Sequence, residues 1–103
     1  MLKKMGKEDA GFLLRNIEAE KCFWANNGPI ISSLEALPNA VKNISEETFS
    51  YHVNKGKNDF SVWVNEVIGD KTLARELLKA KNQKTFLKKA EERVKLLKKI
   101  AGR

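Results

Sequence analysis

Apolar side chains recur three or four positions apart through most of this chain, and glycine, proline and short polar segments interrupt the pattern. That spacing is the period of a helix with one buried face, whereas half-buried strands alternate every second residue. A length of 103 residues suits one hydrophobic core. The sequence therefore predicts an all-α fold in which residues 1–103 form a single helical domain, a compact bundle of five to six short helices with a longer basic C-terminal helix.

Turn and capping residues divide the predicted helices. Asn27-Gly28-Pro29 is a turn signal, and Pro38 indicates either a kinked second helix or two short helical pieces, because an interior proline costs a helix about 3 kcal/mol. Residues whose side chains suit the N-cap position precede five segments, and they are Ser32 or Ser33, Ser45, Asn58, Asp70 and Asn82. The helices are predicted near residues 7–21, 33–44, 45–54, 58–68, 71–81 and 82–101.

The predicted core consists of the apolar residues that share the inner faces of these helices. They are Phe12, Ile17, Leu34, Leu37, Val41, Phe49, Val53, Phe60, Val64, Leu73, Leu77, Leu87 and Val94, with Trp63, Ala74 and Leu78 on the same stripes.

Positive charge is concentrated in the last quarter of the chain. Residues 1–78 carry ten Lys and Arg against eleven Asp and Glu, whereas residues 79–103 carry ten against two, so the net charge of +7 divides into −1 and +8. Such a helix can attract polyanions through charge, but a solvated cationic face near a helix C-terminus is the favoured interpretation. The candidate polyanion-binding residues are Lys84, Lys88, Lys89, Arg93, Lys95, Lys98, Lys99 and Arg103.

His52 is the only histidine, and Asn58, Asp59 and Trp63 follow it closely. An imidazole oriented by Asp59 has the chemistry of a general acid or base. The alternative is a structural corner, in which Asn58 caps a helix and His52 contacts Asp59 across a turn. Because no nucleophile or metal set accompanies the histidine, the corner is the favoured interpretation and no catalytic residue is predicted.

Other residues have two interpretations as well. Trp24 beside Asn26 and Asn27 suits an aromatic platform for sugars or bases, but a tryptophan covering the core is favoured. Cys22 is favoured as a buried structural thiol over a nucleophile. The segment around Gly69 has the pattern of a helix-turn-helix, in which the second helix would present its outer side chains to DNA, but an ordinary αα-hairpin has the same pattern and is favoured. Those side chains are Lys71, Thr72, Arg75, Glu76 and Lys79.

Composition excludes several classes of protein. One cysteine and one histidine make neither an internal disulfide nor a four-ligand zinc site, so neither metal nor cofactor is expected. The longest apolar runs are much shorter than the roughly 20 residues that span a bilayer, and no signal-type segment follows the charged N-terminus. We therefore expect a cytoplasmic protein that does not insert into membranes.

A longer pattern, HVNxxxNDFxxWxxxVxGDxxLA, begins at His52 and ends at Ala74. It resembles a prokaryotic family of domains of unknown function, in which a leucine-rich helix, F-x-x-H, N-D-F-x-x-W and a second leucine-rich helix recur, sometimes attached to larger enzymes. The resemblance covers about residues 23–78 and implies a module with no assigned reaction. Family members often carry a second histidine near the first, whereas Tyr51 and Val53 flank His52 here.

These features favour a non-enzymatic protein-interaction or regulatory module with a basic C-terminal helix. Its expected partner is another protein or a second copy of the chain. The alternative is a nucleic-acid-binding protein that uses the basic face of residues 84–103. A small enzyme or ligand binder centred on His52 and Asp59 is a third hypothesis.

Overall fold

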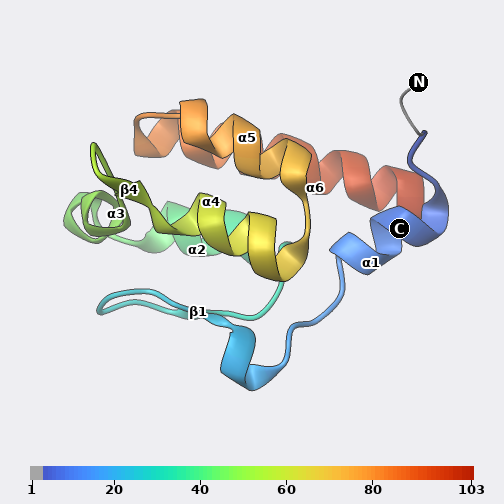
Figure 1. Ribbon diagram of the computed structural model, residues 1–103, viewed down its shortest axis with the longest axis horizontal. Helices are drawn as coiled ribbons and strands as arrows, with labels where there is room; N and C mark the ends of the chain where they lie inside the picture. The colour runs from blue at the N-terminus through green and yellow to red at the C-terminus, as the bar shows by residue number, and fades with distance from the viewer. Residues whose placement is uncertain (1–3) are drawn as a thin grey trace.

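In the computed structural model, which describes residues 4–103, 62% of the chain is helical. The mainly helical single domain predicted from the sequence is confirmed, including its long C-terminal helix, but the fold is not strictly all-α because it contains two antiparallel hairpins (Figure 1). The elements in chain order are α1 (Lys7–Leu13), the 3₁₀ turn η1 (Ala19–Lys21), β1 (Phe23–Trp24), β2 (Ile30–Ile31), α2 (Leu37–Asn43), α3 (Glu46–His52), β3 (Val53–Asn54), β4 (Lys57–Asn58), α4 (Asp59–Trp63), the π-helical turn η2 (Val64–Ile68), α5 (Lys71–Lys79) and α6 (Gln83–Ala101).

The two hairpins correct the all-α prediction. In the first, Phe23 pairs with Ile31 and both are buried, whereas the neighbouring pair of Trp24 and Ile30 faces outward. Asn27 turns the chain at its tip with a φ of 54°. In the second hairpin, β3 and β4 follow α3 directly and lead into α4. Each strand has only two residues, which is too short to leave a period-two pattern in the sequence.

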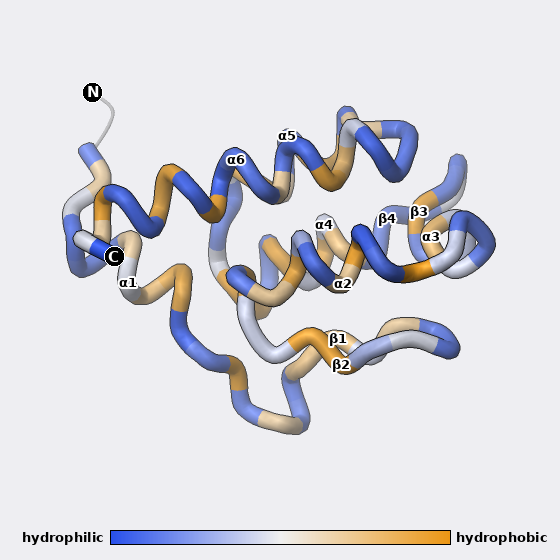
Figure 2. The backbone as a smooth tube through the Cα atoms, turned by 180° about the vertical axis from the view of Figure 1, so that it is seen from behind, coloured by the Kyte–Doolittle hydropathy of each residue, from blue (hydrophilic) through white to orange (hydrophobic). Residues whose placement is uncertain are grey.

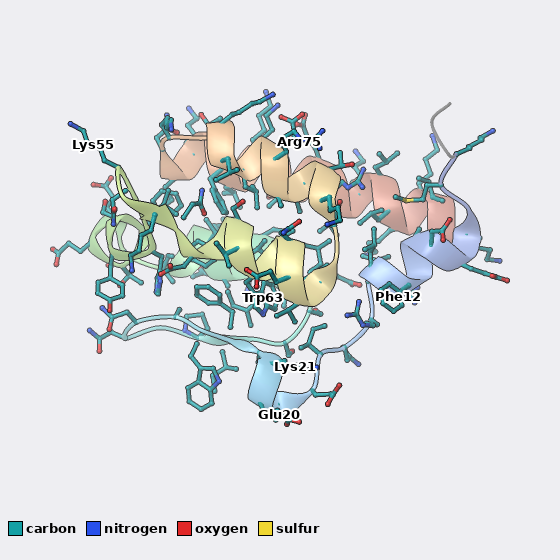
Figure 3. All side chains as sticks on the ribbon, in the orientation of Figure 1. Phe12, Glu20, Lys21, Lys55, Trp63 and Arg75 are labelled. Carbon is teal, nitrogen blue, oxygen red and sulfur yellow. The ribbon has the colours of Figure 1, made fainter. Side chains whose placement is uncertain are left out.

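The first helix is shorter than predicted. It ends at Leu13 instead of near residue 21, and Arg15 then donates to the carbonyls of Phe12, Val67 and Ile68 at 2.8–3.0 Å. The Phe12 ring stacks on the Arg15 guanidinium, 3.9 Å from centroid to carbon, on the outer side of α1 (Figure 3). With 57% of its surface exposed, Phe12 is not a core residue, so that prediction is wrong.

Pro38 lies in the first turn of α2, where its missing N–H breaks no helical hydrogen bond. The second helix therefore begins at Leu37 and not near residue 33, and neither a kink nor a second piece is needed. Ser33 instead accepts a hydrogen bond from the Ala36 amide in the turn that precedes the helix.

The core lies around α6, which contacts α1, α2 and α5, while α4 and η2 pack against α5. Figure 2 shows apolar and polar segments alternating along α6, as expected for a helix with one buried stripe. Aromatic rings continue the core toward the first hairpin, since Phe60 stacks on Phe23 at 4.5 Å and contacts Phe86 at 5.4 Å. Ile17, Val53 and Leu87 are only partly buried, and Leu78 is exposed, contrary to prediction. The predicted core residues that are buried are Leu34, Leu37, Val41, Phe49, Phe60, Trp63, Val64, Leu73, Ala74, Leu77 and Val94.

Helix boundaries in the second half of the chain follow the predicted caps. Ser45, Asn58, Asp70 and Asn82 each accept a hydrogen bond from the amide three residues later, at 2.8–3.1 Å. Gly69 ends η2 with a φ of 93°, a conformation that glycine adopts without strain. Among residues 4–103, no helix has the length and apolar character needed to cross a membrane.

Candidate functional site: the His52 corner and a basic groove

His52 closes a polar corner between α3 and α4. It is the last residue of α3, Asp59 is the first of α4, and hairpin β3–β4 brings them together, so that Nδ1 of His52 lies 2.9 Å from Oδ2 of Asp59. Its Nε2 accepts a hydrogen bond from the backbone amide of Asn26 at 3.0 Å. Because that amide can only donate, the neutral imidazole must carry its proton on Nδ1 and donate it to Asp59.

Aromatic rings enclose the rest of the imidazole. Phe23, Tyr51 and Phe60 lie with their centroids 4.9–5.3 Å from it, and only 5% of the His52 surface is exposed. Both ring nitrogens are therefore engaged inside the protein. A general acid or base needs one nitrogen within reach of the substrate, so this geometry supports the structural interpretation.

Asp59 carries the negative charge of the corner. Burial acts to raise its pKa, but hydrogen bonds from His52 and Lys57 and the positive charge of Lys57 outweigh this effect and lower the pKa below its usual value. The Lys57 ammonium lies 3.0 Å from the carboxylate and 4.5 Å from the centroid of the Tyr51 ring. Asp59 is therefore ionised at neutral pH.

We expect Asp59→Asn to lower stability at pH 7 and to have little effect in acid. A carboxyl whose pKa is lower in the folded state stabilises the fold above about pH 4, and this contribution is lost as the pH falls through the folded pKa. Urea denaturation from pH 7 to pH 2.5 measures the difference between the parent and the variant. A difference that stays constant over this range would show that the Asp59 charge does not stabilise the fold.

Asn58 and Trp63 form hydrogen bonds with backbone groups that do not belong to the His52–Asp59 pair. Asn58 is buried, and its amide nitrogen donates to the Leu77 carbonyl at 3.1 Å while its oxygen caps α4. Trp63 lies on the side of α4 that faces the first hairpin (Figure 3), and its indole nitrogen donates to the Lys21 carbonyl at 2.8 Å. His52, Asn58 and Asp59 thus lie at the start of α4, whereas Trp63 is its last residue and makes a separate contact.

Arg93 differs from the other cations of α6 because it forms a largely buried ion pair. Its guanidinium donates to both oxygens of Asp70 at 2.8 and 2.9 Å, and side-chain exposure is 14% for Arg93 and 1% for Asp70. The expectation that Arg93 belongs to a solvent-facing basic surface needs correction, because its charge is used inside the fold. Sequence reasoning missed the pair, since only the cap at Asp70 left a local signal.

Four of the other candidate polyanion-binding residues line one groove, and the remaining three lie outside it. Lys95, Lys98, Lys99 and Arg103 line an open groove of about 790 Å³ between α2 and the C-terminal half of α6. Lys84 and Lys88 lie on α6 outside this groove, and Lys89 is 3.8 Å from Glu76 of α5. We call this open groove the basic groove. The residues that line it are Glu35, Pro38, Asn39, Lys42, Glu91, Val94, Lys95, Lys98, Lys99 and Arg103.

Lys42 of α2 adds a fifth cation that sequence analysis did not assign to the site. Its signal was present, because Glu35, Pro38, Asn39 and Lys42 have the spacing of one helix face. Two carboxylates also reach the groove, and one of them, Glu35, lies 3.5 Å from the Lys98 ammonium. Five cations against two anions leave the basic groove with a net positive charge.

The remaining candidates are distributed over the surface. Trp24 is 68% exposed, so the interpretation that it covers the core is wrong. Cys22 is half-buried, and its thiol donates to the carbonyls of Ile17 and Glu18 at 3.5 and 3.4 Å. Of the α5 residues considered for DNA contact, Glu76 is partly buried beside Lys89. The others are exposed, and they are Lys71, Thr72, Arg75 and Lys79.

Within the described part of the chain, no cluster of three or more histidine, cysteine or acidic residues has a geometry that would hold a metal ion. Comparisons with protein-family models, curated proteins and solved structures found no match for this sequence.

Proposed function

We propose that this chain is a cytoplasmic, non-enzymatic protein-interaction module that binds an acidic segment of a partner protein in the basic groove. One observation carries the proposal: cations from two helices, Lys42 on α2 and Lys95, Lys98 and Lys99 on α6, converge on a single concave surface. Concave surfaces of one charge sign attract ligands of the opposite sign and raise their association rate.

The lining of the groove favours a polypeptide over a nucleic acid. Val94 and Pro38 provide apolar surface between the lysines, and Glu35 and Glu91 interrupt the positive charge. A phosphate backbone would bring a charge near both carboxylates, whereas a peptide can place acidic side chains on the lysines and apolar side chains on Val94. The proposed ligand is therefore a segment that combines acidic and apolar residues.

The proposal is tested by charge reversal at matched positions on α6. We expect Lys95→Glu/Lys99→Glu to weaken binding of a fluorescein-labelled peptide of Glu and Leu residues by about tenfold or more, since two attractive contacts become repulsive. Lys84→Glu/Lys88→Glu changes the net charge equally but outside the groove, and should weaken binding by no more than about threefold. Fluorescence anisotropy at about 50 mM salt measures both.

Equal losses in the two double variants would contradict recognition in the groove. The same titrations with a mixed-sequence RNA and a DNA duplex test the alternative function. If these probes bind more tightly than the peptide and both variants reduce their binding equally, the basic helix acts as a nucleic-acid contact instead.

A further inference from the structure

We propose that protonation of His52 releases the loop at the tip of hairpin β1–β2, which makes the Asn26 amide and the imidazole a pH-sensitive latch. The latch joins distant parts of the chain, because Asn26 lies 26 residues before His52 and its N–H points at Nε2 from 3.0 Å. It is independent of the basic groove, which α2 and α6 form.

Protonation changes the number of N–H donors on the imidazole ring, and this change is the physical basis of the latch. A neutral imidazole offers one N–H and one lone pair, and the corner uses both, since Nδ1–H donates to Asp59 and Nε2 accepts from Asn26. A protonated ring has two N–H groups and no acceptor. Its Nε2–H then faces the Asn26 N–H, and a donor opposed to a donor leaves the buried imidazole N–H and the Asn26 amide without a partner.

The groups around His52 determine which side moves. From β4 and α4, the Asp59 carboxylate holds Nδ1 and also binds the Lys57 ammonium, while Tyr51 flanks the ring from α3. From the first hairpin, the contacts are the Phe23 ring and the Asn26 backbone. A positive imidazole is held more strongly by Asp59, so the Asn26 loop must move away.

The movement is limited to the tip of the hairpin. Thr48 donates its hydroxyl to the Asn26 carbonyl at 3.2 Å, and the buried Phe23–Ile31 pair keeps the two strands on the core. Between pH 8 and pH 5 Asp59 has a lowered pKa and stays ionised, so it continues to hold Nδ1 over the range in which the latch is tested. The hairpin itself therefore remains folded when the loop is released.

Nuclear magnetic resonance of the ¹⁵N-labelled protein tests the latch. From pH 8 to pH 5 we expect the Asn26 amide resonance to shift in one transition with the same midpoint as the His52 ring nitrogens, and its protection from hydrogen exchange to fall by about tenfold or more. The Ser61 amide, which Asn58 binds, should keep both its shift and its protection. His52→Gln retains an acceptor for Asn26 but has no titrating ring, so the transition should be absent.

Two results would overturn the proposal. In the first, the His52 ring titrates while the Asn26 amide keeps its shift and protection. In the second, the ring stays neutral down to pH 5. Loss of protection at Ser61 together with Asn26 would also count against it, since that result indicates global unfolding and not release of a loop.

Discussion

Replacing Arg93 by methionine is expected to lower the free energy of unfolding by about 3–5 kcal/mol, because it leaves the Asp70 carboxylate buried without its partner. Asp70 joins the start of α5 to the middle of α6, and its Oδ1 accepts from both Arg93 and the Leu73 amide. Methionine keeps most of the apolar volume of the arginine stem. Urea denaturation at pH 7 measures the loss.

A matched substitution on the same helix separates burial from charge. Lys89→Met removes a cation whose contact with Glu76 is exposed, and it should change stability by no more than about 0.5 kcal/mol. Asp70→Asn/Arg93→Met removes both charges of the buried pair and should recover part of the loss, because the amide is cheaper to bury than an unpaired carboxylate. Equal effects of Arg93→Met and Lys89→Met would show that the Asp70–Arg93 pair contributes nothing beyond an ordinary surface contact.

Asn58→Ala is expected to cost about 2–4 kcal/mol, which adds the loss of a helix cap to the loss of a buried hydrogen-bond donor. The Asn58 side chain caps α4 through Ser61 and also satisfies the Leu77 carbonyl of α5. Asn82 provides the comparison, since it caps α6 through Thr85 but is exposed and has no second contact of this kind.

Asn82→Ala should therefore cost only about 1 kcal/mol. The difference between the two alanine variants, measured by urea denaturation under the same conditions, reports the contact between α4 and α5. If the two costs are the same, the hydrogen bond to Leu77 adds nothing to the cap.

The features predicted correctly from the sequence depend on near neighbours. Four helix caps bind amides only three residues away, so a short segment of sequence is enough to predict each of them. These caps are Ser45, Asn58, Asp70 and Asn82. The stripes of α5 and α6 likewise repeat within a few turns, although Leu78 shows that the width of a stripe is decided by the elements packed against it. Part of the corner was also readable, because a tight hairpin brings His52 to Asp59 over seven residues.

Features that depend on distant residues were missed for the same reason. The helix predicted over residues 7–21 ends early, since Arg15 binds carbonyls 52 and 53 positions away. Arg93 and Asp70 are 23 residues apart, and Lys42 faces Lys95 only because α2 packs on α6. In the sequence, each of these cations lies in a predicted helix and cannot be distinguished from a solvated surface charge. Their roles are set by which helices become neighbours.

The contact between α1 and α6 joins an early part of the chain to a late one, and the Lys7 side chain lies close enough to Gly102 to contact an added Cβ at 3.4 Å. A ribosome makes α1 long before it makes α6. Until α6 has left the exit tunnel, α1, whose Ala10 and Leu13 are buried in the folded protein, lacks the helix that it packs against. The nascent chain must therefore carry an uncovered apolar face at least from the synthesis of α1 to that of α6, a period in which early helices are exposed to chaperones and to misassembly.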